Sequence, residues 1–185
     1  PYMAPNVDEV VARGAALMAT SLATPDYQKK SGIDLLKKIV VKEKTVFTYG
    51  IDLLDRYNKL VFTPIIKKGS MLPALDGVIG ATSRPYQERV LLNVFRGDNP
   101  VPSENEYLGE LVLDINKPMQ QEIPILALFE IDENMIIRFR SVQIPMSQEY
   151  AELIGSNDIK RLKAYLDMGR LKATEVIIDA KESGR

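Results

Sequence analysis

The sequence predicts a mainly β protein: an antiparallel two-layer β-sandwich with a short N-terminal helix and a C-terminal helical, lid-like segment. Seven runs rich in β-branched and aromatic residues follow one another between positions 45 and 142. Gly, Pro, Asn and Asp residues separate these runs, and such residues favour turns. We expect strands at 45–53, 59–67, 73–82, 88–96, 107–114, 123–131 and 135–142.

Two of these runs predict how the strands are covered. Ile137 and Phe139 alternate with two arginines, so the last strand should turn one face to the core and the other to water. In contrast, every residue from Leu126 to Phe129 is apolar. Such a run needs cover on both faces of its sheet, from another layer, a helix or a ligand.

The two ends of the chain show helical patterns. Asn6 can cap a helix that has Glu9 three positions on, and the apolar residues that follow share one face. That face would pack either on a preceding domain or on the protein's own sandwich. After position 146, a short helix and a second helix ending at Gly169 are expected. Residues 174–180 fit a last helix or an additional strand.

The composition argues against several classes of function. With 24 basic and 25 acidic residues, the net charge of -1 provides no field to attract nucleic acid or an anionic membrane. The sequence contains neither His nor Cys, which removes the usual zinc ligands and the Ser-His-Asp and Cys-His catalytic groups. No stretch approaches the roughly 20 apolar residues of a membrane-spanning helix. We therefore expect no nucleic-acid, membrane or metal partner.

An enzyme active site is not expected in these residues. Carboxylates, Lys, Tyr and Ser remain as candidate catalytic groups, and Glu130 and Asp132 form the most suggestive pair. This pair lies at a predicted hairpin turn, where charged residues are ordinarily solvated. We interpret it as part of the turn.

Four stretches of sequence carry a family resemblance. YNKLVFTPIIKKGSMLP begins at Tyr57, VLLNVFRGDNP at Val90 and NEYLGELVL at Asn105. In this order and at this spacing they resemble the peptide-binding β-sandwich of the seventy-kilodalton heat-shock chaperone family. NVDEVVARGAALMA, which begins at Asn6, is similar to the last helix of that family's ATPase domain.

The resemblance implies four segments. Residues 1–20 correspond to the last helix of a preceding ATPase domain, 21–43 to a connection with the interdomain linker, 44–145 to the substrate-binding sandwich and 146–185 to a truncated helical lid. The apolar triplet Ile39, Val40 and Val41 resembles the linker, and residues 34–36 match its residue types as well. The sequence leaves open whether the triplet instead begins the first strand.

The resemblance also implies a pocket for one side chain of a bound peptide. Its aliphatic candidates are Ile51, Leu54, Val90, Leu92 and Ile125. Two further positions depart from the family pattern, since Gly80 stands where a pocket Phe is usual and Ser83 where an arch Ala is usual. These departures imply a wider pocket or none. Without the resemblance, each aliphatic residue would be read as ordinary sandwich core.

The implied function is capture of extended hydrophobic segments of unfolded polypeptide, coupled through the linker to ATP hydrolysis in the full-length protein. The partners would be unfolded polypeptide, co-chaperones and the protein's own ATPase domain, and the compartment would be the cytoplasm. ATP and Mg would bind in the full-length parent and no cofactor in these residues. The alternative is a diverged regulatory or interaction module, of the nucleotide-exchange type, that no longer cycles substrate.

Overall fold

The computed structural model describes Ala15 and residues 43–180 of a chain that divides into two units, Pro1–Lys42 and Glu43–Arg185. Ala15 is helical. The rest of the predicted N-terminal helix and the linker candidates Ile39, Val40 and Val41 lie outside the described residues. The second unit is described below.

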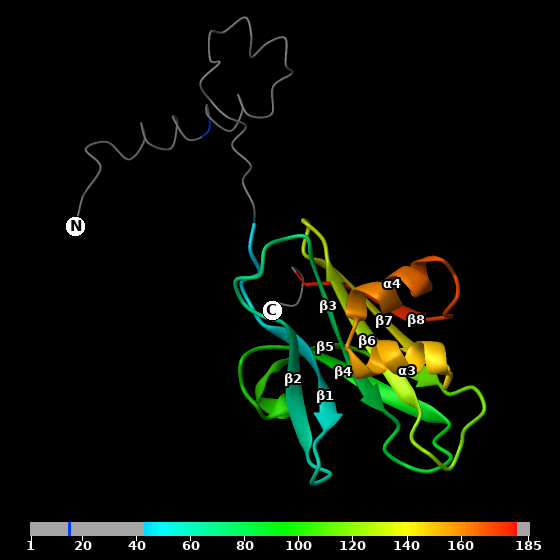
Figure 1. Cartoon of the computed structure of the whole chain (residues 1–185). Helices are drawn as coiled ribbons and strands as arrows, with labels where there is room; N and C mark the ends of the chain where they lie inside the picture. The colour runs from blue at the N-terminus through cyan, green and yellow to red at the C-terminus, as the bar shows by residue number, and fades with distance from the viewer. Residues whose placement is uncertain (1–14, 16–42, 181–185) are drawn as a thin grey trace, which may run out of the picture. The chain divides into compact units, whose positions relative to one another are not determined.

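Eight strands of this unit form two antiparallel sheets of four strands each (Figure 1). The first sheet has the order β2-β1-β4-β5 and the second the order β3-β6-β7-β8. The strands are β1 (Tyr49–Leu54), β2 (Leu60–Ile66), β3 (Ala74–Ala81), β4 (Arg89–Arg96), β5 (Glu106–Asp114), β6 (Pro124–Ile131), β7 (Ile136–Gln143) and β8 (Thr174–Asp179). A single turn of 3-10 helix, η1 (Pro102–Glu104), precedes β5.

The predicted β-sandwich is confirmed, and each of the seven predicted runs overlaps one of the strands β1 to β7, which extend at most one residue beyond it. The two helices expected after position 146 are present, and residues 174–180, which fitted either a helix or a strand, contain a strand. Two helices, α3 (Gln148–Gly155) and α4 (Ile159–Asp167), lie between β7 and β8 in the chain, and the strand β8 follows them. The strand forms because the run Val176 to Ile178 is β-branched and pairs antiparallel with β7, with Ile178 opposite Ile137.

The main core lies between the two sheets. Phe129 and Phe139, which face each other on β6 and β7, are fully buried there with ring centroids 4.6 Å apart. Ile178 of β8 belongs to the same cluster, which shows that β8 completes the sandwich. This strand is therefore part of the domain core.

A second core forms on the outer face of the second sheet, where α3 and α4 cover it (Figure 1). Leu126 and Leu128 point into this cluster, whereas Ala127 and Phe129 point into the main core. Leu162 of α4 is completely buried against them. The expectation that β6 needs cover on both faces is thus confirmed, and helices supply the second cover.

Charged side chains also join α4 to the second sheet. Arg140 on β7 donates from Nη2 to Glu130 at 2.7 Å and from Nη1 to Asp167 at 3.0 Å. Lys163 on α4 lies 3.2 Å from Glu130 and also pairs with Asp167. The hydrogen bond from Lys163, together with that from Arg140, holds the pKa of Asp167 below its ordinary value. These four residues form an ion cluster between helix and sheet.

Candidate functional site

The candidate peptide site lies at the end of the sandwich where three connections meet: β1–β2 (55–59), β3–β4 (82–88) and β5–β6 (115–123). Two of these are tied together by backbone hydrogen bonds. Thr82 donates to the carbonyl of Ile123 at 3.0 Å, and Tyr86 donates to the carbonyl of Met119 at 2.8 Å. The buried Thr82 hydroxyl accepts a further bond from the Ile123 amide at 3.0 Å. These hydrogen bonds therefore join the β3–β4 connection to the β5–β6 connection.

Four of the five aliphatic candidates belong to, or pack against, the main core cluster. Ile51, Leu92 and Ile125 are 0%, 3% and 4% exposed, and all belong to the main core. Val90 is partly buried and packs against the same cluster. β1 and β4 supply one wall of this group and β6 the other.

Leu54 lies apart from that group. It is 42% exposed, whereas Ile51 and Leu53 on the same strand pack into the core. The reason is geometric, because successive side chains of a strand alternate and residues 51 and 54 are three positions apart. Leu54 therefore stands at the rim, on the outer side of the first sheet.

The backbone at this end offers an incomplete ladder. Strand β1 continues to Leu54, but its pairing with β4 stops at Ile51, opposite Val94. Beyond this point the Asp52 carboxylate accepts from the Asn93 amide nitrogen at 3.1 Å and from its side-chain nitrogen at 2.8 Å. Residues 52–54 thus have no ladder partner on their β4 side among the described residues. Such an edge can pair with an extended chain.

The β1–β2 turn beside this edge is held by its own residues. The Asp55 carboxylate accepts from the backbone amides of Tyr57 at 2.8 Å and Lys59 at 3.0 Å. Asn58 has a φ of 56°, which Asn tolerates better than most residues. One lip of the candidate site is therefore a well-bonded tight turn.

Gly80 and Ser83 take different places. Gly80 lies in β3 opposite Ile125, and a Cβ added there would meet no atom within 4 Å. Ser83 is exposed in the β3–β4 connection, where its amide donates to the Gln87 side-chain oxygen at 2.9 Å. Gln87 in turn donates to the carbonyl of Arg89 at 2.8 Å. Ser83 thus braces its own loop.

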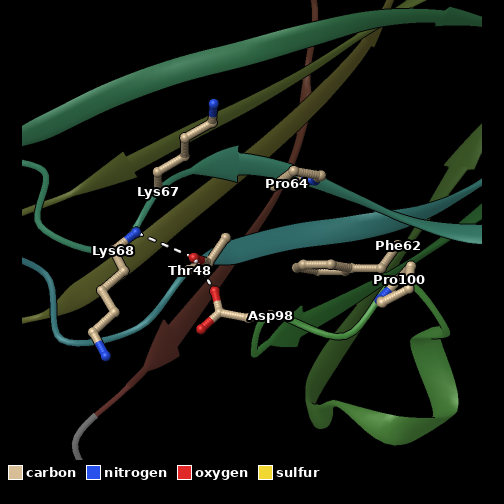
Figure 2. Close-up of a pocket in the computed structure, with 7 residues that line it drawn as sticks. All are labelled: Thr48, Phe62, Pro64, Lys67, Lys68, Asp98 and Pro100. Atoms are coloured by element: carbon tan, nitrogen blue, oxygen red, sulfur yellow. Dashed lines mark hydrogen bonds between the residues drawn. The ribbon is translucent and has the colours of Figure 1, made fainter.

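A separate pocket of about 340 Å³ lies toward the other end of the first sheet (Figure 2). There the Thr48 hydroxyl donates to Asp98 at 2.6 Å and accepts from the Lys68 amide at 3.2 Å. The Phe62 ring and Pro100 form its apolar side. Sequence reasoning missed this pocket because its residues come from β2 and three connecting segments far apart in the chain.

Two more pockets, of about 450 and 520 Å³, lie near Leu75 at the start of β3. None of the seven predicted site residues lines any of these three pockets. The candidate site is therefore distinct from these three pockets.

The paired carboxylates have structural partners. Asp132 accepts from the amides of Asn134 at 2.8 Å and Ile136 at 2.9 Å, as expected of a hairpin turn. Glu130, however, lies within β6 and belongs to the ion cluster, so its assignment to the turn is wrong. Both carboxylates are engaged in holding the fold.

Residues 43–180 contain neither a cluster of metal-ligating side chains nor a membrane-spanning helix. Within this range, no group of three or more carboxylates could hold a metal ion. No helix in the same range is long and apolar enough to cross a membrane.

The fold and the rim together define a β-sandwich with a candidate site for extended polypeptide. The model of the Hsp70 protein family matches residues 1–165, so the chain belongs to the Hsp70 family. Membership supports a chaperone-type function. Full-length members of the family use ATP and Mg and generally bind unfolded polypeptides and co-chaperones.

Proposed function

We propose that the sandwich captures extended hydrophobic segments of unfolded proteins. The observation that carries this function is that the part of β1 without a partner on its β4 side lies beside a group of aliphatic side chains. We call this group, Val90, Leu92 and Ile125, the aliphatic floor. Residues 52–54 have backbone to pair with an extended chain, and Val90, Leu92 and Ile125 lie behind them. The rim residue Leu54 would contact the peptide from the first sheet.

The expected affinity is modest. Burying a Leu-sized side chain contributes about 1.5–3 kcal/mol, and each backbone hydrogen bond adds about 0.5–1.5 kcal/mol. Ordering an extended peptide opposes these gains. A dissociation constant in the micromolar range, corresponding to about 8 kcal/mol, is consistent with one anchor and several backbone bonds.

In the longer protein, this capture is coupled to ATP hydrolysis through the linker at Ile39, Val40 and Val41. Residues 1–20 are then the end of the ATPase domain, and that domain, co-chaperones and unfolded chains are the partners, in the cytoplasm. Because β8 belongs to the core and the two helices cover the second sheet, we place the end of the sandwich domain after β8. In this scheme α3 and α4 are a fixed cover, and they do not serve as the lid.

A second function, a regulatory or interaction module that no longer cycles substrate, is favoured by a different observation. Ile51, Leu92 and Ile125 are almost completely buried, and Gly80 offers no side chain to grip a ligand. In that case the aliphatic group is simply core.

Fluorescence anisotropy of a labelled Leu-rich heptapeptide separates the two functions. For peptide capture we expect saturable, micromolar binding that Val90→Trp weakens about tenfold or more, because a bulky ring at this partly buried position obstructs the rim. Val46→Trp is the matched control, since Val46 is 59% exposed and lies before β1, at the other end of the sheet. This control should leave the affinity unchanged.

Absence of saturable binding up to millimolar protein would exclude peptide capture and favour the regulatory module. Equal weakening by the two Val→Trp variants would place the peptide elsewhere. Far-UV circular dichroism of each variant confirms that the sandwich is intact before affinities are compared.

A further inference from the structure

Strand β3 contains two glycines, and packing explains only one of them. A Cβ at Gly77 would lie 2.8 Å from the Ala127 carbonyl oxygen and 3.2 Å from Ile159 of α4. A Cβ at Gly80 would meet nothing within 4 Å. Gly80 also has no positive φ, so its backbone conformation does not require glycine. A glycine within a strand often marks a place where a ligand approaches closely.

The direction of the open space follows from the alternation along β3. Val78 packs against the main core, whereas Ile79 packs into the cluster under the helices. The missing side chain of Gly80 therefore points to the same side as Val78, toward the space between the sheets. Its register partner there is Ile125, which belongs to the aliphatic floor.

The chemistry of the surroundings is apolar. Ile125, Leu92 and Val90 are aliphatic, and the buried hydroxyl of Thr82, two residues beyond Gly80, is already bonded to the Ile123 amide. One backbone bond from the Thr82 amide to the Ile123 carbonyl, and the bond to the Thr82 hydroxyl, hold this edge of the space in place. A ligand group here needs no charge and no hydrogen bond, but it must be bulky enough to occupy the room that a side chain at position 80 would take.

We propose that Gly80 is a specificity-determining residue that admits a bulky aromatic side chain, so that the substrate class is extended peptide with a central Phe or similar ring. The inference rests on the proposed function, peptide capture at this rim. An aromatic side chain has a large apolar surface to bury, and its ring would fill the space that Gly80 leaves open.

The test compares two heptapeptides that differ only in a central Phe or Leu, measured by anisotropy on the 185-residue chain. We expect the Phe peptide to bind about tenfold more tightly. A difference of one methylene group or more in an apolar pocket changes affinity by a factor of this order. Gly80→Phe should abolish this preference because its own ring fills the space. Gly80→Val, a smaller change that suits a strand, should reduce it.

Ala81→Phe is the matched control. Ala81 is the next residue of β3, is exposed, and points to the opposite face, so the same ring there should leave the tenfold preference intact. Equal affinity of both peptides for the unaltered chain would overturn the inference, as would equal loss of preference in Gly80→Phe and Ala81→Phe.

A second measurement separates this inference from the proposed function. N-acetyl-phenylalanine amide and N-acetyl-leucine amide are titrated while amide chemical shifts are followed by NMR. We expect larger shifts at Gly80 and Ile125 with the aromatic probe. Absence of shifts at both positions would overturn the inference even if heptapeptides bind. Shifts there without binding of either heptapeptide would overturn peptide capture and leave the aromatic space in place.

Discussion

The Asp52 carboxylate bridges to Asn93 at the point where the pairing of β1 with β4 ends, bonding both the backbone and the side-chain nitrogen of that residue. Asp52 is only 7% exposed, so these bonds also satisfy a buried charge. The side chain of Asp52 bonds to Asn93 where the ladder ends, and residues 52–54 have no ladder partner on that side among the described residues. The point at which the β1–β4 pairing ends coincides with this contact.

Asp52→Ala should lower the free energy of unfolding by about 2–3 kcal/mol, because it removes two hydrogen bonds to a charged group and leaves the partly buried Asn93 amide unpaired. Urea unfolding at neutral pH measures the change. The control is Asp114→Ala, which removes an ion pair with Arg89 whose two side chains are more than three-quarters exposed. That variant should change stability by less than about 1 kcal/mol. Similar losses in both would show that the bridge has no special role.

The two glycines of β3 should respond oppositely to alanine. Gly77→Ala should destabilise the protein by about 1–3 kcal/mol, because the methyl group would press on the Ala127 carbonyl and on α4. Gly80→Ala should be neutral or stabilise it by about 0.4–1 kcal/mol, because the methyl group meets open space and the unfolded chain loses freedom. Thermal unfolding of the two alanine variants gives the comparison. Destabilisation by Gly80→Ala would contradict the finding that a Cβ at this position meets open space.

Leu162→Ala should destabilise the whole domain by about 2–5 kcal/mol, because it leaves a cavity in the cluster between α4 and the second sheet. Leu91→Ala is the control, since Leu91 is 52% exposed on β4. Urea unfolding followed by near-ultraviolet circular dichroism reports the core packing. If α4 instead opened as a lid, Leu162→Ala would leave the unfolding of the sandwich unchanged.

The ion cluster predicts a dependence on pH. Pairing with Lys163 and Arg140 lowers the pKa of Asp167, so its stabilisation is complete above the ordinary pKa of about 4 and is lost as pH falls through the lower folded value. Asp167→Asn should therefore lower the free energy of unfolding at pH 7. On acidification, this variant should lose less of that free energy than the unaltered protein does. Urea midpoints at a series of pH values test this.

Salt provides the control for that measurement. The Asp167 side chain is 45% exposed, so about 1 M salt should shrink the difference between the two proteins at pH 7. If the urea midpoints of both proteins fell by the same amount between pH 7 and acid pH, Asp167 would not contribute through its charge.

Much of this fold could be predicted from local sequence. The β-branched runs and turn residues located the seven strands, and the continuous run Leu126 to Phe129 indicated cover on both faces. β8 remained ambiguous because Val176 to Ile178 suits either a strand or a buried helix face. Only pairing with β7, a tertiary contact, makes the choice.

The site was predicted less completely. Ile51, Val90, Leu92 and Ile125 all contribute to the main core, and their role in peptide binding stays a prediction. Leu54 is exposed because side chains alternate along a strand, which the resemblance did not take into account. The Asp52 bridge and the ion cluster join residues that lie far apart in the chain. No local pattern marks such pairs, so only the folded structure reveals them.

Hydrogen–deuterium exchange with and without a Leu-rich heptapeptide tests peptide capture most directly. We expect slower exchange in residues 52–59 and 82–88, because an added extended chain would pair with the β1 edge and order both lips, with no change in α3 or α4. Protection confined to the Phe62 pocket or the helices, or no protection at saturating peptide, would contradict capture at this rim.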